Sequence, residues 1–206
     1  MNKFLKIVTA TVMVASLGAC ATPSQSSATE DTKENSALTL LTDYRTNGSF
    51  TNEAVKDEDL QTILSAGLNS PSALNAKPWQ FNVVTDPDLI NELADTDGTK
   101  TAPVMILVSV DNSNEMKILG AGLATEAMST AAQILGYSTK IETAPARTIR
   151  NDESGKYAEM LEIGDDKSCR AALFIGYPDE NATDTESSAT VETGTDGYVK
   201  YYTSQK

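Results

Sequence analysis

The chain has 206 residues, of which 40% are hydrophobic, and it carries a formal net charge of −13 with no histidine. This length and composition suit one globular domain with its own core. The acidic balance argues against a nucleic-acid partner, which needs clustered lysine and arginine. The absence of histidine excludes histidine-based catalytic triads and most zinc sites, so we expect no metal site.

The first twenty residues have the pattern of an export leader. Lys3 and Lys6 precede the apolar run 7–17, which is too short to span a bilayer but typical of a signal-peptide core. The run ends in Leu-Gly-Ala-Cys20, which resembles a bacterial lipobox and implies removal of residues 1–19 and lipidation of Cys20. We therefore expect a domain in the bacterial cell envelope, outside the cytoplasm and lipid-anchored to a membrane. An ordinary secretion signal with an accidental cysteine is the alternative.

Two polar segments flank the expected domain, which covers residues 37–179. Residues 20–36 have the composition of a disordered tether. Residues 180–206 form an acidic tail whose stretch 198–202, YVKYY, is a possible strand that pairs with another subunit or frays. Once Cys20 carries lipid, Cys169 has no disulfide partner, and its apolar neighbours predict a buried small side chain in preference to a reactive thiol.

Apolar spacing and turn residues predict a mixed series of helices and strands between residues 37 and 179. We expect helices over 38–44 and 57–68, from Pro87, and over 115–135 and 154–163. We expect strands over 79–84, 103–110, 138–142 and 169–177. Asn114 is placed to cap the long helix and Gly136 to end it. The mixture indicates an α+β or α/β fold.

The stretch SPSALNAKPWQF, residues 70–81, holds the only tryptophan of the chain. Pro71 stops the preceding helix because it lacks an N–H and its ring clashes with the next turn. Ser72 and Asn75 supply short polar groups able to bond a ligand, and Trp79 opens the next strand. A proline-rich turn beside a buried tryptophan is the simpler interpretation of the same residues.

Residues 71–79 resemble the P-S-x-x-N-x-Q-P-W motif of the nitroreductase family. Three later features agree with that family over residues 37–179: Ala102-Pro103 before a buried strand, Leu135-Gly136-Tyr137 after a long Ala-rich helix, and the closing Ile175-Gly176-Tyr177-Pro178. The resemblance implies a three-layer α+β fold in which helices flank a central mixed sheet. It also implies a homodimer with FMN at the interface.

In such an enzyme the flavin carries the chemistry, so no catalytic side chain is expected. The resemblance implies two-electron transfer from NAD(P)H through FMN to a nitroaromatic, quinone or related small acceptor. Because NAD(P)H is scarce outside the cell, another electron donor is the alternative for an exported domain. The residues expected to bind the cofactor are Arg45, Thr46, Pro71, Ser72, Ala73 and Asn75.

The expected phosphate-binding segment departs from the family pattern. Tyr44 and Gly48 stand where the family has basic residues, and Arg45 is one residue out of phase. Other basic residues available to compensate are Lys140, Arg147 and Arg150, although the two arginines also fit a solvated face. The altered positions leave a second interpretation open, a flavin-free ligand-binding or interaction lipoprotein that keeps the fold. A surface protein that uses its tail for assembly is a third.

Overall fold

The computed structural model describes residues 38–41, 49–94, 102–179, 199–200 and 202. The predicted leader with Cys20, the tether and most of the acidic tail lie outside these residues. Residues 38–41 are helical, as expected for the start of the first helix. Within the predicted late strand, Val199, Lys200 and Tyr202 are described, and none of the three lies in a strand. Across the described parts of the chain, no helix is both long and apolar enough to cross a membrane.

Four strands form one sheet in the order β1-β2-β4-β3. They are β1 (Trp79–Val84), β2 (Val104–Asp111), β3 (Ser138–Glu142) and β4 (Lys167–Gly176). All four strands were predicted, with small differences at their ends. The three pairings between the described strands are antiparallel. The expectation of a mixed sheet is therefore wrong for this part of the chain: β2 and β3 run in the same direction, but β4 lies between them and is antiparallel to both.

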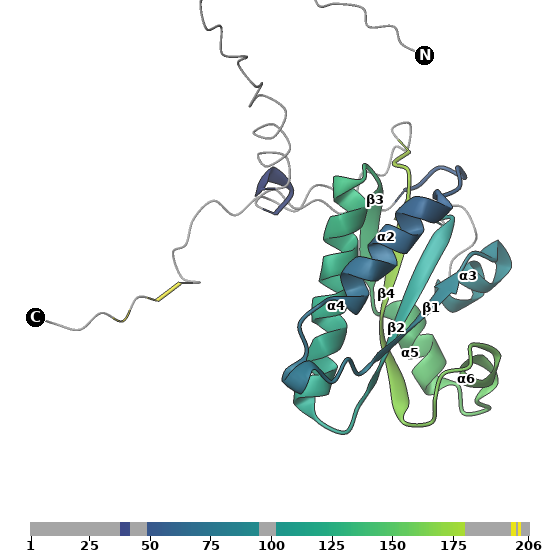
Figure 1. Ribbon diagram of the computed structural model, residues 1–206. Helices are drawn as coiled ribbons and strands as arrows, with labels where there is room; N and C mark the ends of the chain where they lie inside the picture. The colour runs from purple at the N-terminus through teal and green to yellow at the C-terminus, as the bar shows by residue number, and fades with distance from the viewer. Residues whose placement is uncertain (1–37, 42–48, 95–101, 180–198, 201, 203–206) are drawn as a thin grey trace, which may run out of the picture.

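Helices cover both faces of the sheet, so the fold has the three layers that were predicted (Figure 1). One face carries α2 (Asp57–Leu68) and α4 (Glu115–Ile134), and the other carries α3 (Pro87–Ala94), α5 (Ala144–Asn151) and the short α6 (Lys156–Met160). The central strand β2 is buried from its first residue to Val110 because both of its faces are covered. Its nearly continuous apolar sequence follows from that position.

Two apolar clusters, one on each face, make up the core. The cluster under α2 and α4 includes Ile106, Val108 and Leu173, and the cluster on the opposite face includes Met105 and Leu107. Cys169 belongs to the second cluster and is almost fully buried, as predicted. Burial raises the pKa of its thiol, which favours the neutral, unreactive form.

The predicted helices differ from the structure in three places. Leu68 was expected in the apolar stripe of α2, but it is exposed and Gly67 is buried in its place. A side chain is not accommodated at Gly67, since its Cβ would lie 2.7 Å from Cγ of Met128. Helix α5 was not predicted, and the helix expected over residues 154–163 is reduced to α6. Asn114 caps α4 as expected, accepting a hydrogen bond from the backbone N–H of Lys117.

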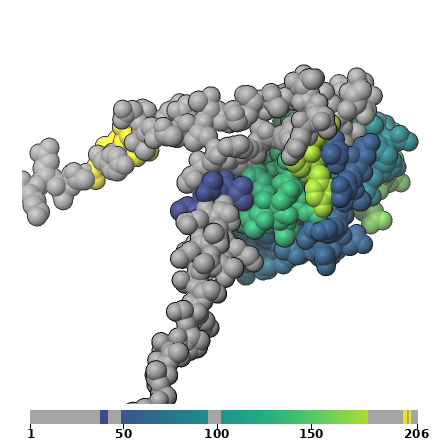
Figure 2. Space-filling model, turned by 90° about the horizontal axis from the view of Figure 1, so that it is seen from above, coloured from purple at the N-terminus to yellow at the C-terminus, as the bar shows by residue number. Residues whose placement is uncertain are grey.

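The two ends of the sheet carry different parts of the predicted site. At one end, Ser49 and Thr51 run beside the last residues of β4, with hydrogen bonds from Thr51 N to Tyr177 O (2.9 Å) and from Asp179 N to Ser49 O (3.2 Å). Figure 2 shows this end from above, where yellow-green residues of the end of β4 lie beside blue residues of the first part of the domain. At the other end lie the loop after α2, the start of β1 and the end of β2.

Candidate functional site

The loop between α2 and β1, residues 71–78, has an unusual backbone. A single 3-10 turn, Ala73–Asn75, follows Pro71 and Ser72. Three non-glycine residues of the loop have positive φ: Leu74 (55°), Asn75 (54°) and Lys77 (45°). Each such residue costs about 1–3 kcal/mol and persists only where the surrounding structure holds it, and backbone strain of this kind concentrates at functional sites. We therefore take this loop, called the cofactor loop below, as the centre of the candidate site.

Hydrogen bonds hold the cofactor loop from within and from the sheet. Ser72 accepts twice, from Asn75 N at its carbonyl oxygen (2.9 Å) and from Lys77 N at its hydroxyl oxygen (3.0 Å). The carbonyl oxygen of Pro78 accepts from Asp111 N at 3.1 Å, which fixes the loop to the end of β2. These bonds explain how the positive-φ residues persist.

Trp79 anchors the loop to the core, as the sequence predicted. It is 8% exposed, and its ring stacks on Phe81 with the ring centres 6.1 Å apart. The loop also packs on α4 at Gly120, where a Cβ would lie 3.4 Å from Cγ of Pro78 and 3.7 Å from Trp79. The close approach brings the loop onto the amino-terminal half of α4.

The outer side of the cofactor loop presents small and neutral polar groups. Ser72 and Ala73 are half-buried, whereas Pro71 and Asn75 are exposed. Leu74 is fully exposed at the tip. The hydroxyl of Ser72 still has a hydrogen to donate after accepting from Lys77, and the Asn75 carboxamide offers both donors and an acceptor. This arrangement suits the polar edge of a flat ring system.

Four of the six predicted cofactor-binding residues, Pro71, Ser72, Ala73 and Asn75, lie together in this loop. Arg45 and Thr46, with the altered positions Tyr44 and Gly48, lie outside the described residues.

Two of the three proposed substitutes for a phosphate ligand have other contacts. Lys140 pairs with Glu142 at 2.8 Å, and Arg150 donates to the carbonyl oxygen of Cys169 at 2.6 Å. Arg147 is exposed on α5. Lys140 and Arg150 therefore have structural contacts within their own protomer.

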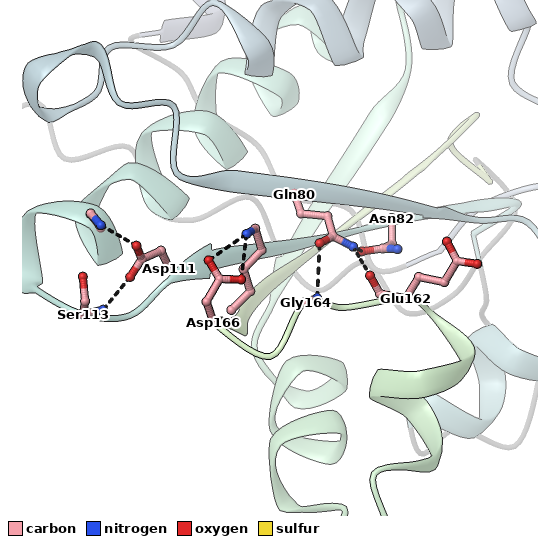
Figure 3. Close-up of polar contacts among 9 residues, drawn as sticks. Gln80, Asn82, Asp111, Ser113, Glu162, Gly164 and Asp166 are labelled. Carbon is pink, nitrogen blue, oxygen red and sulfur yellow. Dashed lines mark hydrogen bonds and ion pairs between the residues drawn. The ribbon is translucent and has the colours of Figure 1, made fainter.

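A polar clamp on the edge strand β1 was missed by the sequence reasoning. Gln80 donates to the carbonyl oxygen of Glu162 (2.7 Å) and accepts from Gly164 N (3.5 Å) (Figure 3). Asn82 donates to the carbonyl oxygen of Leu161 (2.5 Å). The two amides hold the segment between α6 and β4 against β1. In the sequence, the alternation of Gln80 and Asn82 with Trp79 and Phe81 indicates that the two amides share one face of the strand. Their hydrogen-bond partners lie about eighty positions later in the chain, so the sequence does not indicate them.

Two ion pairs lie at the end of the sheet that carries the cofactor loop. Asp111 accepts from Lys117 Nζ and from Ser113 N (2.8 Å), and Lys167 pairs with Asp166 at 3.0 Å (Figure 3). The hydrogen bond from Lys117, followed by that from Ser113, lowers the pKa of Asp111 to about 2. Asp111 is therefore ionised at neutral pH, with its oxygens already engaged.

A hollow of about 570 Å³ lies beside the first residues of α2 and of β2. It is lined by Asn52, Ala54, Val55, Asp57, Leu60, Thr85, Pro87, Ala102, Pro103 and Val104. None of the predicted cofactor-binding residues that the structure describes lines it.

Comparisons of the sequence with known proteins point to one family. The sequence model of the nitroreductase family matches residues 44–98. The chain is 28% identical over 139 residues to an Archaeoglobus fulgidus protein whose name proposes NADH dehydrogenase or NAD(P)H nitroreductase activity, covering 63% of this chain and 78% of that one. It is 26% identical over 170 residues to the FMN reductase (NAD(P)H) of Bacillus subtilis, covering 70% of this chain and 66% of that one.

Solved structures share the fold. An FMN-dependent nitroreductase from Clostridium difficile superposes with a TM-score of 0.60 at 25% identity, covering 70% of this chain and 89% of that one. A Bacteroides fragilis nitroreductase with bound FMN gives a TM-score of 0.69 at 21% identity, covering 82% of this chain and all of the other. The second likeness concerns the fold alone.

The arrangement of helices around an antiparallel sheet is an α+β fold that the chain shares with these solved nitroreductases. With the matches in sequence, the chain is similar to the nitroreductases in both sequence and fold. The predicted resemblance to that family and the predicted fold class are thereby confirmed.

Proposed function

We propose that the chain is an FMN-dependent oxidoreductase that passes two electrons to a nitroaromatic, a quinone or a related small acceptor. The observation that carries the proposal is the cofactor loop, whose strained backbone presents Ser72 and Asn75 in a chain similar to this family. FMN, when bound, supplies the chemistry by accepting a hydride from a donor and passing it to the acceptor. The chain's own residues bind the flavin ring and orient it.

The residues of the cofactor loop fit a flavin ring. A flavin edge offers carbonyl oxygens and ring nitrogens, which need neutral donors and acceptors such as those of Ser72 and Asn75. The loop places no carboxylate against that edge, and Ala73 and Ala76 add little bulk. The fit at the phosphate end depends on Arg45 and Thr46, which the structure does not describe.

The geometry favours a site shared by two copies of the chain. Ser49, three residues after Thr46, lies beside the last residues of β4, whereas the cofactor loop lies at the end where β4 begins. Ten residues of strand span about 30 Å. Ser49 and the cofactor loop therefore lie far apart within one protomer, at opposite ends of the sheet. Antiparallel packing of two protomers would bring the loop of one against Ser49 of the other.

An exposed apolar stripe on α4 provides the surface for this homodimer. Met116, Leu119, Leu123 and Ile134 repeat at helical spacing along the helix, and each is at least 38% exposed. The helix is about 30 Å long at 1.5 Å per residue, so the stripe runs along most of one face. Leu74 at the tip of the cofactor loop is exposed as well. Pairing two such faces would remove these side chains from water.

We propose that a lipid on Cys20 anchors this domain to a membrane outside the cytoplasm, with another reductant in place of scarce NAD(P)H. Export and lipidation both rest on the pattern of residues 1–20. Replacing Cys20 by serine is expected to move the protein from the membrane fraction to the soluble fraction of a bacterial expression host. Immunoblots of the two fractions test this, with Cys169→Ser as the matched control. Equal membrane retention of the Cys20→Ser and unaltered chains would contradict lipidation.

Replacing Asn75 by alanine is expected to weaken FMN binding by about tenfold. The carboxamide contributes a neutral hydrogen bond of about 0.5–1.5 kcal/mol, and 1.4 kcal/mol is a factor of ten in Kd. Quenching of flavin fluorescence during titration measures the change.

The matched control is Asn69→Ala, because the Asn69 side chain bonds only locally to Ser65 at the end of α2. If both variants bind FMN like the unaltered chain, the cofactor loop does not hold the ring.

A further inference from the structure

A second, smaller hollow adjoins the cofactor loop. It has a volume of about 280 Å³ and lies where β2 ends and β4 begins. Its lining residues are Ala76, Lys77, Pro78, Trp79, Asp111, Lys117, Asp166 and Lys167. Ala76 and Lys77 directly follow Asn75, so a group bound in this hollow would lie beside a flavin held by the loop.

Three lysines and two aspartates meet in this hollow, which leaves a formal balance of one positive charge in a chain with a net charge of −13. Asp111 is occupied by Lys117 and Ser113. Within the described residues, Lys77 takes part in no ion pair. An ammonium group has three donors, and Lys117 donates one of them to Asp111. Donors for an anion therefore remain, and each oxygen of Asp111 already accepts one hydrogen bond.

The backbone fixes the position from which Lys77 extends. Its N–H donates to the hydroxyl oxygen of Ser72, and the next residue, Pro78, is held by Asp111 N. Its φ of 45° is a conformation that a lysine rarely adopts. The loop therefore fixes the backbone of Lys77, from which the side chain extends, beside the hollow. The family motif quoted above has a neutral glutamine at the same position.

The start of α4 adds to the positive character of this region. Lys117 lies in the first turn of a 20-residue helix, and the amino-terminal end of a helix carries a partial positive charge. Lys167 approaches from the start of β4, and its side chain is 23% exposed. Three separate elements, namely the loop, α4 and β4, therefore contribute one ammonium group each.

We propose that this hollow binds a carboxylate carried by the electron acceptor, with Lys77 as the principal contact and Lys117 and Lys167 in support. The acceptor class is then an anionic aromatic compound in preference to a neutral one. The assignment to the acceptor rests on the proposed function, whereas carboxylate binding in the hollow does not. Lys77 is a specificity-determining residue for the acceptor.

Two probes of matched shape test the proposal: 4-nitrobenzoate, which is anionic, and 4-nitrobenzyl alcohol, which is neutral. The FMN-loaded enzyme is expected to prefer the benzoate in kcat/KM. Replacing Lys77 by methionine is expected to reduce that preference at least tenfold, because a hydrogen bond to a charged group is lost. Lys156→Met is the control, since Lys156 lies on α6 and pairs with Glu92. An unchanged preference in Lys77→Met, or a loss that appears only in the KM of NADPH, would overturn the proposal.

Binding without turnover separates this inference from the proposed function. Saturation-transfer NMR of both probes is run on the chain with and without FMN. Binding of the benzoate to the unaltered chain, and its loss in Lys77→Met, support the carboxylate site even if the chain takes up no FMN. If FMN binds but the two probes give equal signals, the hollow is not an anion site and the inference is wrong. A circular dichroism spectrum of Lys77→Met that matches that of the unaltered chain shows that the variant is folded.

Discussion

Replacing Leu123 by glutamate is expected to convert the proposed dimer into a monomer and to remove bound FMN. Leu123 lies in the middle of the apolar stripe on α4 and is 38% exposed in the single protomer, so the protomer tolerates a charge there. In the proposed dimer the same position faces the partner, where an unpaired carboxylate would be desolvated at a cost of several kcal/mol. FMN would be lost with the dimer, because the proposed site is shared between the two protomers.

Sedimentation velocity and the absorbance of bound flavin measure the two effects together. Met160→Glu is the matched control, since Met160 is equally apolar and 52% exposed but lies on α6, on the opposite face of the sheet. The Met160→Glu variant should remain dimeric and should keep the absorbance of bound flavin. A Leu123→Glu chain that stays dimeric would refute the α4 interface, and a monomer that still binds FMN would refute the shared site.

Replacing Gly176 by alanine is expected to lower the free energy of unfolding by about 1–3 kcal/mol, the usual cost of overpacking a core. Gly176 is the last residue of β4, where an added Cβ would lie 2.6 Å from Cδ of Pro103 and 3.1 Å from Cδ1 of Phe50. Pro103 has a rigid ring and Phe50 is buried, so neither has room to move away. The same contact joins the end of the sheet to the segment that follows Arg45 and Thr46.

Gly122→Ala is the control for this prediction. Gly122 is exposed on α4, and nothing lies within 4 Å of an added Cβ, so alanine should stabilise the helix by up to about 1 kcal/mol. Urea unfolding at one fixed protein concentration measures both variants, because the stability of a dimer depends on concentration. Equal unfolding midpoints for the two variants would show that the contact at Gly176 is relaxed in solution.

Most of the fold was predictable because its signals are local. The start of α4 follows from Asn114, the end of α2 from Pro71, and strand β2 from an unbroken apolar run. Helix α5 escaped prediction because its buried face consists of only Pro145, Ala146 and Ile149 between polar residues. Such a narrow stripe gives little periodicity, and the helix is stabilised by packing on β4.

The candidate site was predictable in composition but not in geometry. The motif indicated Ser72 and Asn75, yet no pattern predicts positive φ at Leu74 or Lys77, since neither residue type favours it. That conformation depends on hydrogen bonds from Lys77 N and from the end of β2. The hollow beside Lys77 joins three elements far apart in the chain, so it becomes visible only in the folded structure.

The most direct test of the proposed function is the visible absorption spectrum of residues 21–206 during titration with FMN. The proposal predicts saturable binding, with a shifted flavin band and quenched fluorescence, at one FMN per protomer and two per dimer. A chain that remains colourless and leaves the flavin spectrum unchanged at every concentration would contradict it. That result would show that Tyr44 and Gly48 mark the loss of the cofactor in a domain that has kept the nitroreductase fold.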